Sequence, residues 1–135
     1  MNKLETWFQA IAMAAAAWLA SLPVLVILLL LLQGMDILTG LITSGMRGKL
    51  SSAVAFAGIG RKVIALLPVA VAGMTGWALG EYIGFPVELL VQAVAGFYCA
   101  HELLSILENA VNAGLPVPKA LQELVQKLAP EVRPE

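Results

Sequence analysis

Charged residues are scarce in this chain, and their scarcity is the first guide to its class. Only 13% of the 135 residues are charged, whereas 60% are hydrophobic and the mean hydropathy is +0.88. A water-soluble domain of this size carries about 25% charged residues because so much of its surface faces water. The composition therefore excludes an ordinary soluble domain and predicts a protein whose solvent is lipid.

An excess of basic residues and a set of cysteines are also missing. Eight basic residues against nine acidic ones give a net charge of −1, which argues against a nucleic-acid-binding protein that relies on overall attraction to phosphate. The single cysteine, Cys99, excludes an intramolecular disulfide and a cysteine-based metal centre. The sequence has no catalytic triad, phosphate-binding loop or metal-ligand spacing, so we expect no enzymatic activity, cofactor or metal.

Long charge-free runs are present instead, and they predict an all-α membrane protein with four transmembrane helices. We expect spans at about residues 4–20, 22–44, 63–80 and 87–107, with a break between the first two at Ser21-Leu22-Pro23. The first run is short for a span, and three spans remain if it lies in the membrane interface. Residues 45–62 are expected to form a loop, and residues 118–128 have the apolar spacing of a short amphipathic helix. All of this belongs to a single domain over residues 1–135.

The basic residues predict the orientation in the membrane. The expected loop contains Arg47, Lys49, Arg61 and Lys62, whereas the turn over residues 81–88 has two acidic residues and no basic one. Cytoplasmic loops of membrane proteins carry an excess of lysine and arginine. With four spans, the 45–62 loop, the amphipathic tail and both termini are therefore expected in the cytoplasm.

Ionisable side chains lie within or at the ends of the expected spans, where each is costly unless it is paired or faces water. We expect them to converge near the cytoplasmic side, because those of the second and fourth spans lie at similar depth and two bases begin the third. Two interpretations stay open: ion pairs in this cluster fix the register of the helices, or its polar stripe faces a subunit seam and opens to water during assembly. The cluster comprises Asp36, Arg61, Lys62, His101, Glu102, Ser105, Glu108 and Asn109.

Small residues recur every four positions in the third and fourth spans. Such a ladder lets helix backbones approach closely, which drives association in lipid. The approach can take place within one subunit or between subunits of a homo-oligomer. The ladder comprises Ala72, Gly76, Gly80, Gly84, Gly96 and Ala100.

Five short segments form a recognisable pattern over about residues 22–128. They are Asp36-Ile37-Leu38-Thr39-Gly40, Gly48-Lys49-Leu50-Ser51-Ser52, Gly60-Arg61-Lys62, Glu102-Leu103-Leu104-Ser105-Ile106-Leu107-Glu108-Asn109 and Gly114-Leu115-Pro116-Val117-Pro118. In this order and spacing they resemble the toxin-secretion/phage-lysis holin family of bacteriophages. The chain departs from the family pattern at His101, where a polar residue, often asparagine, is usual.

The resemblance implies a phage or prophage protein that oligomerises in the bacterial inner membrane and permeabilises it. An endolysin then reaches the peptidoglycan and lyses the host cell, or a toxin leaves. The implied partners are membrane lipid, further copies of the chain, the endolysin or toxin, and an antiholin. The alternative from another class is a small ion or proton channel or transporter subunit that uses Asp36, His101 and Glu102.

Overall fold

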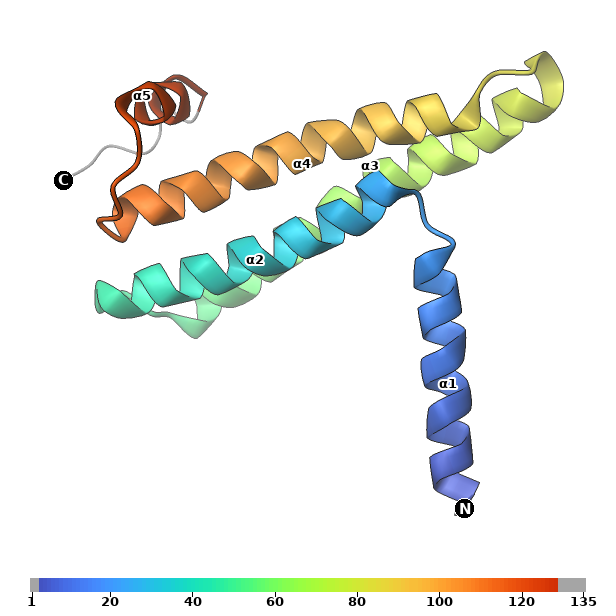
Figure 1. The fold of residues 1–135 in the computed structure, drawn as a ribbon, viewed down its shortest axis with the longest axis horizontal. Helices are drawn as coiled ribbons and strands as arrows, with labels where there is room; N and C mark the ends of the chain where they lie inside the picture. The colour runs from blue at the N-terminus through green and yellow to red at the C-terminus, as the bar shows by residue number, and fades with distance from the viewer. Residues whose placement is uncertain (1–2, 129–135) are drawn as a thin grey trace.

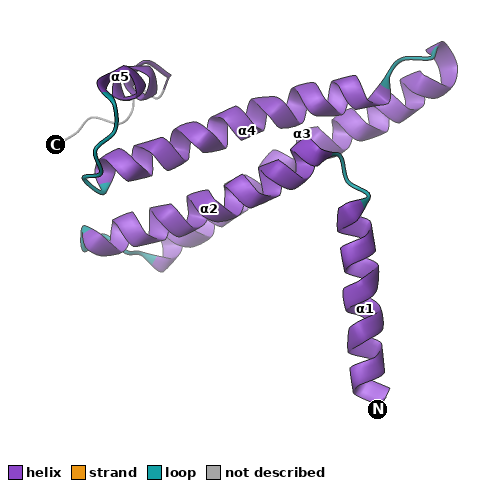
Figure 2. Cartoon of the chain, in the orientation of Figure 1, coloured by secondary structure: helices purple, strands orange, loops and turns teal. Residues whose placement is uncertain are grey.

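The protein is seen in a computed structural model that describes residues 3–128, and these residues form five helices. The helices are α1 (Lys3–Ala20), α2 (Val24–Met46), α3 (Ser52–Ile83), α4 (Val87–Asn112) and α5 (Lys119–Leu128). In Figure 1, α2, α3 and α4 form an elongated bundle, α1 projects away from it, and α5 lies near the C-terminal end of α4. Figure 2 shows helices and loops but no strand in this range, which confirms the expected all-α class.

Three of the helices, α2, α3 and α4, are long and apolar enough to cross a membrane. Inside the protein, 22%, 17% and 22% of their most apolar segments are buried, so large side chains such as Leu31, Trp77 and Phe97 stay exposed. An apolar exterior of this extent suits lipid and not water. Three of the four expected spans are therefore supported. The helix expected over residues 4–20 is present as α1, but it is not among the three.

The expectation of a loop over residues 45–62 is wrong for most of its length. The connection between α2 and α3 is confined to residues 47–51, and residues 52–62 are the first turns of α3. This helical stretch includes Gly58 and Gly60, although a helical glycine costs about 1 kcal/mol relative to alanine. Three alanines precede them in α3, at positions 53, 55 and 57, and alanine has the highest helix propensity of all residues. The turn lies instead at Gly48, whose φ of 65° is left-handed.

The central helix of the bundle is α4, because α2 and α3 both pack along it and contact each other less. Contacts join the start of α4 to the end of α3 and the end of α4 to the end of α2, so α4 runs parallel to α2 and antiparallel to α3. The buried apolar core is narrow and runs along this helix. Its members are Leu29, Leu32, Val69, Ala72, Val91, Ala95 and Cys99.

The small residues on α3 bring its backbone against α4 of the same chain. A β-carbon added at Gly76 would lie 3.0–3.1 Å from Cγ1, Cα and the carbonyl oxygen of Val87, and one added at Gly80 would lie 3.0 Å from Cγ2 of Val87. Ala72, one turn earlier, is buried in the core. Packing within one subunit therefore explains why these three positions hold small residues.

The other members of the small-residue ladder have different environments. Gly84 is the left-handed residue that ends α3, with φ 65°, and its N–H donates to the carbonyl oxygen of Gly80. Gly96 faces Leu25 of α2, and Ala100 is exposed on α4. An oligomer seam built on the ladder stays a prediction, and of these three residues only Ala100 presents a helical face to the outside.

A comparison of two identical substitutions in α3 tests the close approach. In Gly76→Ala the new methyl group overlaps the Val87 backbone, and overpacking of this kind costs about 1–3 kcal/mol. Gly60→Ala is the matched control, because nothing lies within 4 Å of a β-carbon there and the gain in helix propensity is the same. We expect Gly76→Ala to have the lower free energy of unfolding of the two, measured by titrating the detergent-solubilised protein with sodium dodecyl sulfate and following circular dichroism. Equal stability of the two variants would contradict the tight α3–α4 contact.

Candidate functional site

One lysine of α3 lies between two carboxylates from the neighbouring helices. The Lys62 Nζ atom is 2.6 Å from Oδ2 of Asp36 on α2 and also contacts Oε2 of Glu102 on α4. The side chains are 14%, 10% and 4% exposed, respectively. We call Asp36, Lys62 and Glu102 the ion triad, and its two carboxylates and one ammonium group connect all three spans.

The ion triad lies at one level in all three helices. Asp36 is ten residues before Met46, Lys62 is ten residues after Ser52, and Glu102 is ten residues before Asn112. We call this common end of the helices, at residues 46–52 and 112, the loop end. Ten residues of helix rise about 15 Å, which is half of a hydrocarbon core about 30 Å thick. If the loop end lies at the membrane surface, the ion triad lies at mid-depth.

An asparagine on α4 extends the cluster toward the loop end. The Asn109 Nδ2 group donates to Oδ1 of Asp36 at 2.9 Å and to Oγ1 of Thr39 at 3.1 Å. The Thr43 hydroxyl in turn donates to the carbonyl oxygen of Asn109 at 3.1 Å. These bonds join α2 to α4 over two helical turns. Lipid offers no hydrogen-bond partners to these polar groups. The bonds between α2 and α4 therefore satisfy them inside the subunit.

The polar face of α2 is larger than the sequence interpretation assumed. Gln33 is buried, and its Nε2 donates to the carbonyl oxygen of Lys62 at 3.2 Å. Gln33, Thr39 and Thr43 were not among the predicted site residues. Together with Asp36 they are spaced three or four residues apart, which places them on one face of a helix. That spacing is the signal that could have found them.

Four of the eight predicted cluster residues make the direct contacts: Asp36, Lys62, Glu102 and Asn109. Ser105 is half-buried and lines a neighbouring pocket. Glu108 has one carboxylate oxygen, Oε1, that is buried and has no hydrogen-bond partner among residues 3–128.

Arg61 and His101 stand apart from the contacts of the ion triad. Both side chains are exposed, and neither forms an ion pair within the described part of the chain. Of these two adjacent bases, Lys62 is the one that pairs with the buried acids. Successive helical residues point about 100° apart, so only one of the two bases can face the bundle interior.

A pocket of about 270 Å³ opens between α2 and the first turns of α3. Its floor includes Asp36, Lys62 and Asn109, and its lining extends to Lys49 and Ser51 at the loop end. We call it the loop-end pocket. It connects the loop end to the ion triad. No group of three or more metal-ligating side chains occurs in the described range of the chain.

Removal of the central ammonium group should weaken the bundle strongly. In Lys62→Met two carboxylates of the ion triad are left buried without a counter-charge, and breaking a buried ion pair in this way costs about 3–5 kcal/mol. We expect a loss of that size in the free energy of unfolding, measured by detergent titration with circular dichroism.

Two further variants control this measurement. Arg61→Met removes an adjacent, exposed base and should change stability by less than about 0.5 kcal/mol. In the triple variant Asp36→Asn, Lys62→Met, Glu102→Gln no charge is left unpaired, so most of the lost stability should return. Equal losses in Lys62→Met and Arg61→Met would show that the ion triad does not stabilise the bundle.

Comparisons with known proteins find similar sequences that cover most of the chain. The family model described as the bacteriophage holin family matches residues 13–130. An uncharacterised protein of Halalkalibacterium halodurans, BH0965, is 39% identical over 130 residues, which cover 95% of this chain and 96% of that protein. An uncharacterised 14.9 kDa protein of Clostridium perfringens, from the nagH 3′ region, is 30% identical over 128 residues, covering 95% of this chain and 86% of that protein. Lmo0128 of Listeria monocytogenes is 41% identical over 90 residues, covering 67% of this chain and 61% of that protein. No solved structure matches the chain.

Proposed function

The chain belongs to the bacteriophage holin family, and from this membership we propose that it accumulates in the bacterial inner membrane, oligomerises there and permeabilises it. Permeabilisation lets an endolysin reach the peptidoglycan and lyse the host cell, or lets a toxin leave. The observation that carries the proposal is the ion triad: three spans with apolar exteriors keep charged and polar groups buried between them. A subunit of this kind has the groups to line water and the surface to stay in lipid.

The proposed mechanism is an exchange of partners without covalent chemistry. In the single subunit the carboxylates of the ion triad are paired with Lys62, and Asn109 connects α2 to α4. In the assembled state the same polar face borders water, which can solvate these groups, while the apolar faces remain in lipid. Assembly becomes favourable as the membrane concentration of the subunit rises, so accumulation sets the time of opening.

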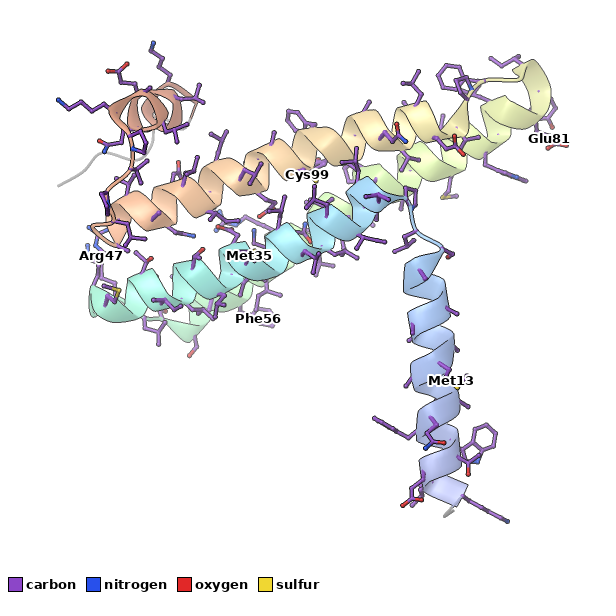
Figure 3. The ribbon with its side chains drawn as sticks, viewed as in Figure 1. Met13, Met35, Arg47, Phe56, Glu81 and Cys99 are labelled. Atoms are coloured by element: carbon purple, nitrogen blue, oxygen red, sulfur yellow. The ribbon has the colours of Figure 1, made fainter. Side chains whose placement is uncertain are left out.

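The charges at the two ends of the bundle support an orientation. Arg47 and Glu81 lie at opposite ends (Figure 3). The loop end carries Arg47 and Lys49, whereas the opposite end carries Glu81 in the last turn of α3 and Glu88 in the first turn of α4. We propose that the loop end and the C-terminal helix α5 face the cytoplasm. If α1 does not cross the membrane, the N-terminus lies on the opposite side.

The proposed partners follow from the mechanism. Further copies of the chain and membrane lipid are the direct contacts, and the endolysin or toxin is a functional partner that passes through the opened membrane without forming a stable complex with the subunit. An antiholin would act by occupying the same helix faces in mixed assemblies. The mechanism involves no nucleic acid.

A proton or cation channel is the rival function, and the position of His101 argues against it. Such a path would use Asp36, His101 and Glu102 in succession. His101 is exposed on the outside of α4, while both acids are buried against Lys62. The three groups therefore do not line one path in this arrangement of the helices.

Expression in bacteria that already hold a cytoplasmic peptidoglycan hydrolase tests the proposed function. We expect a delay followed by abrupt lysis that requires the hydrolase, with loss of membrane potential at the same moment, recorded together as culture turbidity and a potential-sensitive dye. Depolarisation without lysis in the presence of the hydrolase would indicate a small channel and overturn the proposal.

The timing of lysis should respond to the charge of the ion triad. Asp36→Asn keeps the shape of the side chain and leaves one carboxylate paired with one ammonium group, so the closed subunit becomes more stable and lysis is delayed at equal accumulation. Glu81→Gln is the matched control, because it also converts an acid to an amide but lies exposed at the far end of the bundle. Unchanged or earlier lysis in Asp36→Asn would contradict the proposed role of the ion triad.

A further inference from the structure

The loop-end pocket has a strong imbalance of charge. Three bases line it, Lys49, Arg61 and Lys62, against one acid, Asp36. Lys62 and Asp36 are paired with each other. Neither Lys49 nor Arg61 forms an ion pair within residues 3–128, and both side chains are exposed. Two uncompensated cations thus remain beside the pocket, which favours an anion as its occupant.

The rest of the lining combines polar groups with apolar ones. Ser44 and Ser51 contribute hydroxyl groups near the loop end, while Leu41, Leu50 and Val54 provide apolar surface. An anion that enters this pocket therefore also meets hydrocarbon. A free inorganic anion gains nothing from such walls, whereas an amphiphile gains from both kinds of surface.

A second hollow continues the surface along α3. Arg61 lines it as well, together with Ile64, Leu67, Pro68 and Tyr98, and its volume is about 650 Å³. We call it the α3 groove. Apart from Arg61 and the tyrosine, its lining is apolar. Arg61 thus lies where a charged pocket and an apolar groove meet, and the groove runs from there toward the centre of the bundle.

We propose that the loop-end pocket binds the phosphodiester headgroup of an anionic phospholipid, with an acyl chain of the same lipid lying in the α3 groove. Lys49 and Arg61 bind the phosphate, and Ser44 and Ser51 donate hydrogen bonds to its oxygens. Because Arg61 directly precedes Lys62 in α3, it lies below the loop end, and the phosphate is bound within the loop-end pocket, between Lys49 at the loop end and Arg61 near the level of the ion triad. The inference requires only that the chain spans a membrane and is independent of whether it permeabilises one.

Native mass spectrometry of the full chain in detergent, with added phosphatidylglycerol or phosphatidylcholine of identical acyl chains, tests the site. We expect one phosphatidylglycerol to stay bound per chain and phosphatidylcholine to be lost. Lys49→Gln and Arg61→Gln should each weaken phosphatidylglycerol binding about fivefold, the effect of one basic residue at an anionic lipid surface. Arg61→Lys, which keeps the charge, should retain most of the affinity.

Arg47→Gln is the matched control for the substituted bases. Arg47 lies at the same end of the bundle but does not line the pocket, and its Nη1 donates to Oδ1 of Asn112 at 3.4 Å. The Arg47→Gln variant should bind phosphatidylglycerol with an affinity within twofold of that of the parent protein. Equal loss in Arg47→Gln would show general surface attraction, and equal retention of the two lipids would show no headgroup recognition. Displacement of the lipid by inorganic phosphate at equal concentration would indicate a simple anion site. Each of these results would overturn the proposal.

Discussion

The need to satisfy charge inside lipid governs the arrangement of this protein. One ammonium group on α3 has to serve carboxylates on both neighbouring helices, because the other nearby base, Arg61, points outward. That requirement sets the rotation of α3 about its axis and the register of α2 and α4 against it. Asn109 and Gln33 meet the same need, since the side-chain amide of each donates a hydrogen bond to a polar group of a neighbouring helix. The apolar contacts fill the remaining space.

The helices of the bundle are not equally close to one another: α3 and α4 are in tight contact, whereas α2 and α3 contact each other less. The glycines of α3 bring its backbone against the start of α4, where neither helix has room for a larger side chain. By contrast, α2 and α3 meet mainly through α4, and the loop-end pocket lies between them. A buried core of seven mostly small or medium side chains stabilises three helices only when lipid covers their outer faces. The lipid that covers the exterior is therefore part of what stabilises the fold.

Much of this architecture could be predicted because charge is so rare in the chain that each interruption carries information. The charge-free runs and the Ser21-Leu22-Pro23 break located the helices, and the depths of Asp36 and Glu102 predicted their convergence. The start of α3 was missed, because the charge-free run begins only after Lys62, whereas the helix begins at Ser52 and continues through Arg61 and Lys62. The choice of Lys62 over Arg61 depends on the rotation of α3, which is a tertiary property. For the same reason the sequence left open whether Gly76 packs within one chain or between two.

In each of the three spanning helices, ten residues separate the ion triad from the loop end. The distance between these two levels of the subunit is therefore fixed. If the loop end stays at the headgroups, a bilayer thinner than about 30 Å shifts the ion triad past the midplane and closer to the opposite headgroups. Water penetrates more readily to charges near an interface, so the cost of exposing Lys62 and its two acids falls as the membrane thins. The chain is in this sense sensitive to hydrophobic mismatch, and under the proposed mechanism the thickness of the membrane becomes one of the quantities that set the time of opening.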